Sequence, residues 1–257
     1  MPRFAARYEC KYLIDASIVP ELRRFISPFA KHDKFAERAK DHSYWVSSLY
    51  LDSADLHLYN QTVAGECERY KLRVRTYSDD PASPVFFEVK QKFNAIVAKR
   101  RAGVTREQAQ AILRQEPLPF VATLSDADRR DLLFFNHCVA MSQARPITRV
   151  KYLREAFEAR DHEPVRITLD TDLMHAATID DTLSHRDGPW TATPTGGVVL
   201  EIKYTDRLPS WAHEIVQVFA VNQRAVPKYV LSVNHMLRGG RKEAMNVGGM
   251  TLPPMGG

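Results

Sequence analysis

The sequence has little cysteine and no long hydrophobic run, and each shortage excludes a class of protein. Its three cysteines, Cys10, Cys67 and Cys138, are an odd number at wide spacing, which fits neither a disulfide framework nor a zinc site. No stretch approaches the ~18 uncharged apolar residues of a membrane helix. The first residues also lack the apolar core of a secretory signal. We therefore expect a soluble, cytoplasmic protein.

Common nucleotide-binding and catalytic motifs are also missing. There is no Gly-rich P-loop and no G-x-G-x-x-G, which argues against P-loop and dinucleotide chemistry. There is no nucleophile elbow, and the nine histidines form no H-E-x-x-H or other paired metal spacing. Any chemistry must therefore rest on other residues.

Composition and charge describe a globular chain with a local excess of positive charge. Hydrophobic residues make up 44% and charged residues 26% of the 257 positions, enough for a sizeable core. No linker divides the chain, so we expect one domain over 1–237 and a disordered tail over 238–257. The net charge is +5, and nine bases against five acids fall between Glu66 and Arg101. This window predicts an anionic partner: nucleic acid, an acidic membrane or a phosphorylated small molecule.

The hydrophobic periodicity indicates mostly strands, with helices between them. Strand patterns cover residues 7–14, 44–52, 68–77, 85–92, 96–104, 147–157, 165–173, 198–204 and 226–233. Helix patterns cover residues 16–29, 54–63, 105–115, 126–142 and 210–221. Strands in hairpin-like succession predict an α+β fold: an antiparallel barrel or strongly curved sheet with helices outside.

Charged and apolar residues alternate along at least five of these strands. In residues 68–77, for example, Lys71, Arg73 and Arg75 share one face, and Leu72 and Val74 share the other. For a single strand, the simplest interpretation is an amphipathic sheet with its charges in water. Five such strands weaken that interpretation, because the helices must cover the apolar faces. The charged faces would then line a concave interior, which needs a polyanion or a network of ion pairs to fill it.

The same residues also carry a family resemblance, from about Arg7 to Val233. Its segments, in order, are SLYLD (48–52), Tyr59, KLRVRTY (71–77), FEVK (87–90), KRR (99–101), PITRVKY (146–152), RITLDTD (166–172), LEIK (200–203) and PKYV (227–230). Each is short, but their ordered combination is specific. The chain resembles the VTC domain, the polyphosphate polymerase branch of the triphosphate tunnel metalloenzymes, which also include the CYTH phosphohydrolases.

This resemblance implies an eight-stranded antiparallel tunnel that binds a triphosphate or polyphosphate end together with a divalent cation, Mn²⁺ or Mg²⁺. The implied phosphate ligands are Lys11, Arg73, Arg75, Lys90, Lys99, Arg101, Arg149, Arg166 and Lys228, to which the charged strand faces add Lys71 and Lys203. Among them, Arg73, Arg75, Lys90 and Lys228 are the candidate catalytic residues. Glu201 matches the metal-binding carboxylate, and Glu9 and Glu88 are further candidates. Guanidinium groups suit this task because they bind phosphate oxygens bidentately.

The first strand favours one branch of the family. The pattern of hydrolase members on this strand resembles Glu-x-Glu-x-Lys, whereas this sequence has Arg7, Glu9 and Lys11 at the corresponding positions. We therefore predict a metal-dependent polymerase that transfers the γ-phosphate of ATP to a polyphosphate chain. A triphosphate hydrolase and a non-catalytic polyphosphate-binding module remain alternatives. A nucleic-acid surface is disfavoured, because the bases alternate along strands instead of forming an exposed stripe. The sequence leaves open whether the protein has a separate membrane partner.

Overall fold

The computed structural model describes residues 7–93, 96–161 and 164–247. Its strands are β1 (Arg7–Ile14), β2 (Ala30–His32), β3 (Tyr44–Asp52), β4 (Glu68–Thr76), β5 (Val85–Phe93), β6 (Ile96–Val104), β7 (Arg145–Ala159), β8 (Arg166–Ala177), β9 (Thr191–Ala192) and β10 (Val198–Thr205). Its helices are α1 (Val19–Ile26), α2 (Lys34–Arg38), α3 (His57–Ala64), α4 (Arg106–Leu113), α5 (Asp126–Ser142), α6 (Ser210–Val218) and α7 (Lys228–Val247), with short 3₁₀ turns η1 (Ala16–Ile18) and η2 (Pro119–Thr123).

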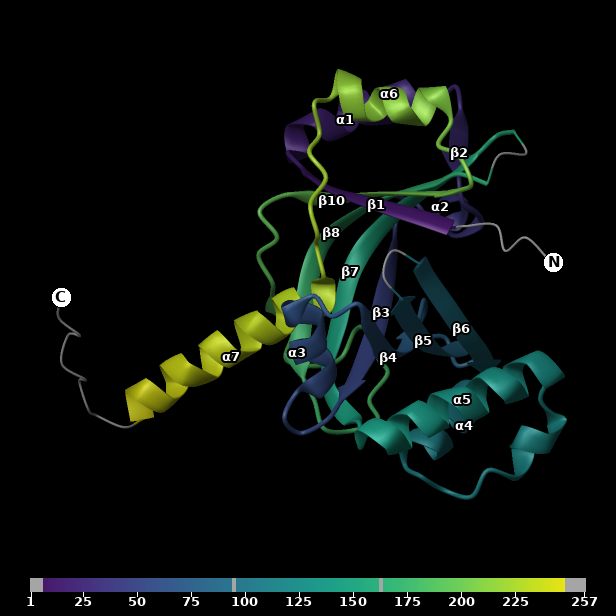
Figure 1. Cartoon of the computed structure of the whole chain (residues 1–257), viewed down its shortest axis with the longest axis vertical. Coiled ribbons are helices and arrows are strands. Elements are labelled where there is room, and N and C mark those ends of the chain that lie inside the picture. The colour runs from purple at the N-terminus through teal and green to yellow at the C-terminus, as the bar shows by residue number, and fades with distance from the viewer. Residues whose placement is uncertain (1–6, 94–95, 162–163, 248–257) are drawn as a thin grey trace.

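One antiparallel sheet contains all ten strands. Eight of them form a continuous path in the order β1-β10-β8-β7-β3-β4-β5-β6, while β2 pairs with β7 and β9 pairs with β8. The sheet is strongly curved, with its helices outside it (Figure 1). The predicted α+β class, antiparallel sheet and outer helices are therefore confirmed.

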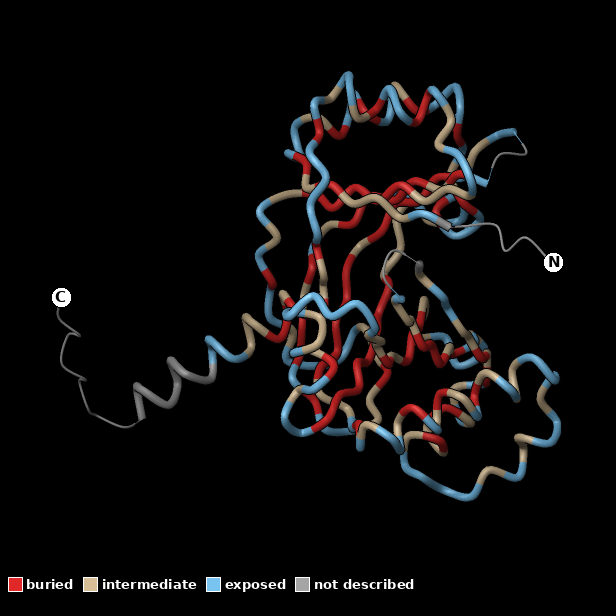
Figure 2. The backbone as a smooth tube through the Cα atoms, in the orientation of Figure 1, coloured by how far each residue is buried: buried red, intermediate tan, exposed pale blue. Residues whose placement is uncertain are grey.

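Two helical layers cover the outer, apolar faces of the sheet (Figures 1 and 2). Helices α1 and α6 pack on β1, β10 and β8 around a core that includes Leu22, Leu200 and Ile215. Helices α4 and α5 pack on β4, β5 and β6, where Phe87 meets Phe135 edge to face at 5.0 Å. Because the apolar faces are used outside, the alternating charged residues point to the concave side of the sheet.

The sheet is not closed by hydrogen bonds between its two edge strands. In the part of the chain that the structure describes, no ladder joins β1 to β6. On β6, two backbone N–H groups instead donate to carboxylates of α5: Arg101 N to Asp131 at 3.1 Å and Gly103 N to Asp128 at 2.8 Å. These carboxylates therefore satisfy backbone N–H groups that would otherwise be free to pair with another strand. An ion pair spans the seam, because Lys90 Nζ donates to both carboxylate oxygens of Glu9 at 3.0 Å.

The C-terminal part of the chain differs from the prediction. Residues 226–233, expected to form the last strand, instead lead into α7, which begins at Lys228. Val226, Tyr229, Val230 and Val233 are all buried, and their spacing of three and four residues is the helical period. The helix continues to Val247, where we expected the start of a disordered tail. The rest of that predicted tail, 248–257, lies outside the described residues.

Other boundaries moved by a few residues. The helix predicted over 16–29 is split into η1 and α1, and β2, α2, β9 and η2 were not predicted. Within the described ranges, no helix is long and apolar enough to cross a membrane. The assignment of residues 1–237 to a single domain stays a prediction.

Candidate active site

A cavity of about 650 Å³ lies on the concave face of the sheet, and we call it the cationic cavity. Its charged lining consists of Lys11, Lys71, Arg73, Arg75, Lys90, Lys99, Arg154, Arg166, Lys203 and Lys228, with Glu9, Glu158 and Glu201 as the only carboxylates among the described lining residues. Cross-strand pairing explains why these side chains meet. Arg73 lies opposite both Tyr50 and Glu88, and Lys11 lies opposite Glu201, and directly opposed residues share one face of a sheet.

Glu88 neutralises part of this charge from below the cavity surface. Its side chain is fully buried and accepts from Arg73 Nε at 2.7 Å. Its other oxygen, Oε1, lies 2.6 Å from Lys99 Nζ and 3.4 Å from Arg101 Nε. Burial alone would raise the pKa of Glu88, but Arg73, Arg75 and Lys99 outweigh it and hold that pKa far below its ordinary value. Glu88 therefore stays ionised and orients the cations around it.

A second group of ion pairs surrounds Glu201. Its carboxylate lies 2.6 Å from Lys203 Nζ, 3.3 Å from Lys11 Nζ and 3.7 Å from Arg154 Nη2. Burial would raise the pKa of Glu201, but Lys203, Lys11 and Arg154 hold it well below its ordinary value. The carboxyl group of Glu9 adjoins Glu201 and also pairs with Lys11 at 2.8 Å. Two ionised carboxylates therefore lie side by side at one part of the cavity.

A third group links α7 to the sheet. Asp170 accepts two hydrogen bonds from Arg154, at 2.6 and 2.8 Å, and lies 2.7 Å from Lys228 Nζ. Burial raises the pKa of Asp170, but the two cations outweigh this and lower it to about 2. The Lys228 ammonium also lies over the Tyr152 ring, 4.7 Å from its centroid. Lys228 therefore reaches the cavity from the start of α7 instead of from the predicted strand.

Some of the positive charge has no counter-ion. Among the described residues, neither Lys71 nor Arg75 has a carboxylate within ion-pair distance. Burial and the neighbouring cations Lys11 and Lys90 lower the pKa of Lys71 to about 8. Burial also lowers the pKa of Lys90 to about 8, although Glu9 opposes this. Burial disfavours the charged ammonium groups, and nearby cations disfavour that of Lys71 further, so an anion that enters the cavity would stabilise both protonated lysines.

Two phenols extend the set of polar groups. Arg73 donates to the Tyr50 hydroxyl at 3.4 Å, and Arg75 donates to the Tyr152 hydroxyl at 3.3 Å. Burial would raise the pKa of Tyr50, but Arg73 and Arg75 outweigh it and lower the pKa to about 8. The Tyr50 ring also stacks on Tyr229 at 4.7 Å. Both phenols thus lie where they can contact a bound anion.

The structure brings most of the predicted site residues together. Those that line the cationic cavity are Lys11, Lys71, Arg73, Arg75, Lys90, Lys99, Arg166, Lys203 and Lys228, together with Glu9 and Glu201. Arg101 does not line it, because its guanidinium lies over the Phe86 ring, 3.4 Å from the centroid, and pairs with Glu88. Glu88 does not line it either, because its side chain is fully buried beneath Arg73, Lys99 and Arg101 and does not reach the cavity surface. Glu88 is therefore an ion-pair centre and does not fit the predicted metal-ligand role.

Arg149 is the clearest departure from the predicted site. It lies on the outer face of β7, where its guanidinium donates to the carbonyls of Ser184 and Asp187 at 3.0 and 2.9 Å. Gly188 makes this approach possible, because a Cβ there would lie 2.3 Å from Arg149 Nη2. The cavity-facing arginine of β7 is instead Arg154, which we did not predict. Its signal in the sequence is its even spacing from Tyr152, since alternate residues share a face.

The two adjacent carboxylates fit a divalent cation that arrives with phosphate. Within the described ranges, no group of three or more His, Cys, Asp or Glu side chains could hold a metal by itself. Mg²⁺ is commonly bound by one or two carboxylates plus substrate phosphates, without an all-protein cage. Glu9 and Glu201 supply two such carboxylates beside cations that can hold the phosphates. The donor set therefore suits a metal–triphosphate complex.

Comparisons with known proteins give the following. A family model described as the VTC domain matches residues 6–237, a range that includes every residue lining the cationic cavity. No curated protein matches the chain. A solved structure from Bacillus halodurans, described as a candidate adenylate cyclase, is 16% identical and aligns over 86% of this chain and 95% of its own, with a TM-score of 0.47.

Two other solved structures are similar at the same level. One, from Vibrio parahaemolyticus, is also described as a candidate adenylate cyclase; it is 15% identical and aligns over 88% of this chain and 98% of its own, with a TM-score of 0.48. The other, from Hippeastrum, is described as a candidate adenylyl cyclase with a dominant triphosphatase activity. It is 15% identical and aligns over 97% of this chain and 98% of its own, with a TM-score of 0.46.

Proposed function

Because the chain belongs to the VTC domain family, we propose that it is a polyphosphate polymerase that transfers the γ-phosphate of ATP to the end of a polyphosphate chain. The observation that carries this proposal is the cationic cavity, in which ten lysine and arginine side chains face three carboxylates. A triphosphate and a phosphate chain both repeat closely spaced negative charges, which need many fixed cations around them. Both the donor and the acceptor are therefore suited to this one site.

The proposed transfer requires little chemistry from the protein. The acceptor is a phosphate oxygen that is already ionised at neutral pH, so neither a protein nucleophile nor a strong general base is needed. Catalysis then consists of holding donor and acceptor in line and stabilising the charge that develops on the transferred group. Arg73, Arg75 and Lys90 are suited to that stabilisation. Lys228, on a different element from these three, is our choice for a residue that holds the chain.

A divalent cation, Mn²⁺ or Mg²⁺, would be held by Glu201 and Glu9. When bound, it would neutralise part of the negative charge of the phosphates during transfer. The protein's own contribution at this point is orientation, because Lys11 and Lys203 fix the two carboxylates that face the cavity. Position 7 carries arginine, whereas the Glu-x-Glu-x-Lys pattern of the hydrolase members has a glutamate at this position. This difference supports polymerisation over hydrolysis.

The test is incubation of the protein with ATP and either Mn²⁺ or Mg²⁺, followed by a gel stained for polyphosphate and an assay of free phosphate. The proposal expects chains that lengthen with time. Free phosphate alone, at every metal and nucleotide concentration, would identify a hydrolase and overturn it. Binding of tripolyphosphate without either product would identify a binding module. A chain with Arg73→Ala and Arg75→Ala is the control, and it should lose whichever product the normal chain makes.

We expect Glu201→Gln to raise the metal concentration needed for half-maximal activity by at least about tenfold, since losing even an outer-shell partner of a metal ligand costs 10–100-fold. The change keeps the side-chain shape and removes its charge. The measurement is activity against Mn²⁺ concentration. Glu158→Gln is the matched control, because Glu158 lines the same cavity but pairs with Arg166 at 2.8 Å. An unchanged metal dependence in Glu201→Gln would show that Glu201 is only a partner for its neighbouring lysines.

A further inference from the structure

The segments SLYLD (48–52) and PKYV (227–230), far apart in the sequence, meet in the structure through Asp52 and Tyr229. The Tyr229 hydroxyl donates to Asp52 Oδ2 at 2.6 Å. Burial and this hydrogen bond raise the pKa of Tyr229 well above its ordinary value, so the phenol keeps its proton and remains the donor. The contact therefore joins the end of β3 to the first turn of α7.

Asp52 is itself held in place by α3. Its side chain is fully buried, and it accepts the backbone N–H groups of Leu58 and Tyr59, both at 2.8 Å. The N-cap residue of α3, Leu56, has no polar side chain, so Asp52 supplies from β3 the acceptors that the first turn of this helix needs. Asp52 therefore offers Tyr229 an acceptor with a fixed orientation.

The beginning of α7 packs against the sheet, and the helix then runs away from it (Figure 1). Tyr229 and Val233 belong to a buried cluster that includes Tyr50 of β3 and Tyr152 of β7, whereas residues 237–239 are exposed. The Tyr229 ring stacks on Tyr50, with 4.7 Å between the ring centroids. The position of the first turn therefore depends on the contacts around Tyr229.

Lys228 precedes Tyr229 on this turn and lines the cationic cavity. Its ammonium lies 2.7 Å from Asp170 and 4.7 Å from the centroid of the Tyr152 ring. The four-carbon stem of a lysine is flexible, so the place of the ammonium depends on where the turn is held. Asp52 holds the turn through Tyr229, and Asp170 holds it through Lys228.

We propose that Asp52 is a positioning residue of the cationic cavity: through Tyr229, it holds the first turn of α7 where Lys228 can contact a bound phosphate chain. This role rests on the proposed function in one respect, the choice of Lys228 as a residue that holds the chain. Asp52 itself lies outside the lining of the cavity. Without its link to Tyr229 the turn would be free to shift, and a misplacement of about 1 Å is enough to weaken such a contact strongly.

Calorimetric titration with tripolyphosphate, without metal, tests this role. Tyr229→Phe removes only the hydroxyl and leaves the N–H groups of α3 bonded to Asp52, so it separates the link to α7 from the capping of α3. We expect it to weaken tripolyphosphate binding by at least about threefold. In a chain that already carries Lys228→Met, the same change should weaken binding by less than about twofold, because the side chain through which it acts is gone.

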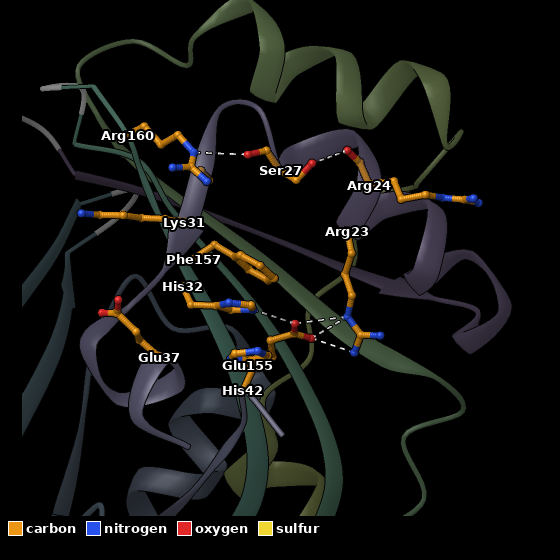
Figure 3. Close-up of a pocket in the computed structure, with 11 residues that line it drawn as sticks. Arg23, Arg24, Ser27, Lys31, His32, Glu37, His42, Glu155, Phe157 and Arg160 are labelled. Atoms are coloured by element: carbon orange, nitrogen blue, oxygen red, sulfur yellow. Dashed lines mark hydrogen bonds and ion pairs between the residues drawn. The ribbon is translucent and has the colours of Figure 1, made fainter. Parts of the chain in front are cut away.

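Two control variants remove comparable groups that do not hold Lys228. Tyr59→Phe removes a phenol that donates to Asn234, further along α7. His32→Phe removes an imidazole whose Nε2 lies 3.2 Å from the buried carboxylate of Glu155, on the outer face of the sheet (Figure 3). Neither Tyr59 nor His32 lines the cationic cavity, so both variants should bind tripolyphosphate within about twofold of the normal chain.

Enzyme kinetics separate positioning from a loss of stability. In the polymerase assay, Tyr229→Phe should raise the KM for a short polyphosphate primer, while kcat and the KM for ATP stay close to normal. Lost stability would instead lower the amount of active protein and thus kcat. A protein that lengthens no chain would refute the proposed function alone, because the tripolyphosphate affinities would still decide the role of Asp52.

Thermal unfolding replaces the titration if Tyr229→Phe is too unstable for it. Tripolyphosphate should then raise the Tm of Tyr229→Phe by less than it raises the Tm of His32→Phe, because a weaker ligand stabilises the folded state less. Normal affinity in folded Tyr229→Phe, or equal weakening with and without Lys228, would overturn the proposal. A normal chain that binds no tripolyphosphate would overturn it as well, together with the proposed function.

Discussion

Replacing Arg73 by alanine is expected to slow phosphate transfer by about 10²–10³-fold, the usual effect of removing one donor that stabilises transition-state charge. Arg73 lies at the centre of the site: it pairs with Glu88 at 2.7 Å, contacts the Tyr50 hydroxyl at 3.4 Å and lines the cationic cavity. Its guanidinium is held by buried partners before the substrate arrives, so little reorganisation is needed during the reaction. The measurement is turnover of ATP with saturating metal, together with ATP affinity.

Two further variants separate the role of Arg73 from general charge. Arg73→Lys keeps the charge and loses the bidentate fork, so it should restore only part of the lost rate. Arg69→Ala removes a cation from the same strand, but its guanidinium donates to the Glu66 carbonyl and does not line the cavity. Its activity should stay close to normal. Unchanged turnover and ATP affinity in a folded Arg73→Ala protein would remove Arg73 from the site.

The strands that build the cavity could be predicted because their periodicity is strong. The bounds of β1, β3 and β6 agree with the predicted 7–14, 44–52 and 96–104. The charged faces of β4 and β5 follow from simple alternation, which places Lys71, Arg73, Arg75, Glu88 and Lys90 together. In these strands the side-chain pattern alone decides which face each residue occupies. Packing of helices on the apolar side then settles which face is concave.

Arg149 and Arg154 show where alternation fails. Along β7 the charged pair Arg149 and Lys151 alternates with Val150 and Tyr152, so the pattern places the cations inside. In the structure these cations lie outside, because the segment between β8 and β9 supplies carbonyls to both of them, including that of His185 to Lys151 at 2.9 Å. Tyr152 and Arg154 lie inside. No local sequence pattern can predict that a distant loop will provide carbonyl acceptors for an arginine.

The start of α7 shows a second limit. Residues 226–233 are rich in β-branched and aromatic side chains, which favour strands. Their tertiary contacts favour a helix instead: the Tyr229 hydroxyl donates to buried Asp52 at 2.6 Å, and the Tyr229 ring stacks on Tyr50. Asp52 also accepts the backbone N–H groups of Leu58 and Tyr59. The helix is thus fixed by a carboxylate 177 positions away in sequence, which a short window cannot detect.

Replacing Glu88 by glutamine is expected to lower the free energy of unfolding by about 3–5 kcal/mol, the usual cost of removing one partner from a buried ion pair. Glu88 is fully buried and faces Arg73, Lys99 and Arg101. Without its charge, these cations repel one another and the uncompensated Lys71 and Arg75 nearby. The measurement is denaturant-induced unfolding at pH 7. Glu68→Gln, at the exposed start of β4, is the control and should change stability by less than about 0.5 kcal/mol.

The cost of Glu88→Gln should also depend on pH and on bound phosphate. Because the folded state holds the pKa of Glu88 far below its ordinary 4.5, its contribution is complete above that value and is lost as the pH falls through it toward the folded pKa. The difference in the free energy of unfolding between the normal chain and Glu88→Gln should therefore become smaller below about pH 4.5. Tripolyphosphate at neutral pH should narrow this difference as well. Losing the Glu88 charge leaves more uncompensated cations around the cavity, so the variant should bind the anion more tightly and gain more stability by mass action than the normal chain. If neither acid nor tripolyphosphate changes this difference in the free energy of unfolding, Glu88 stabilises the sheet by packing, and the cations around it do not form a phosphate site.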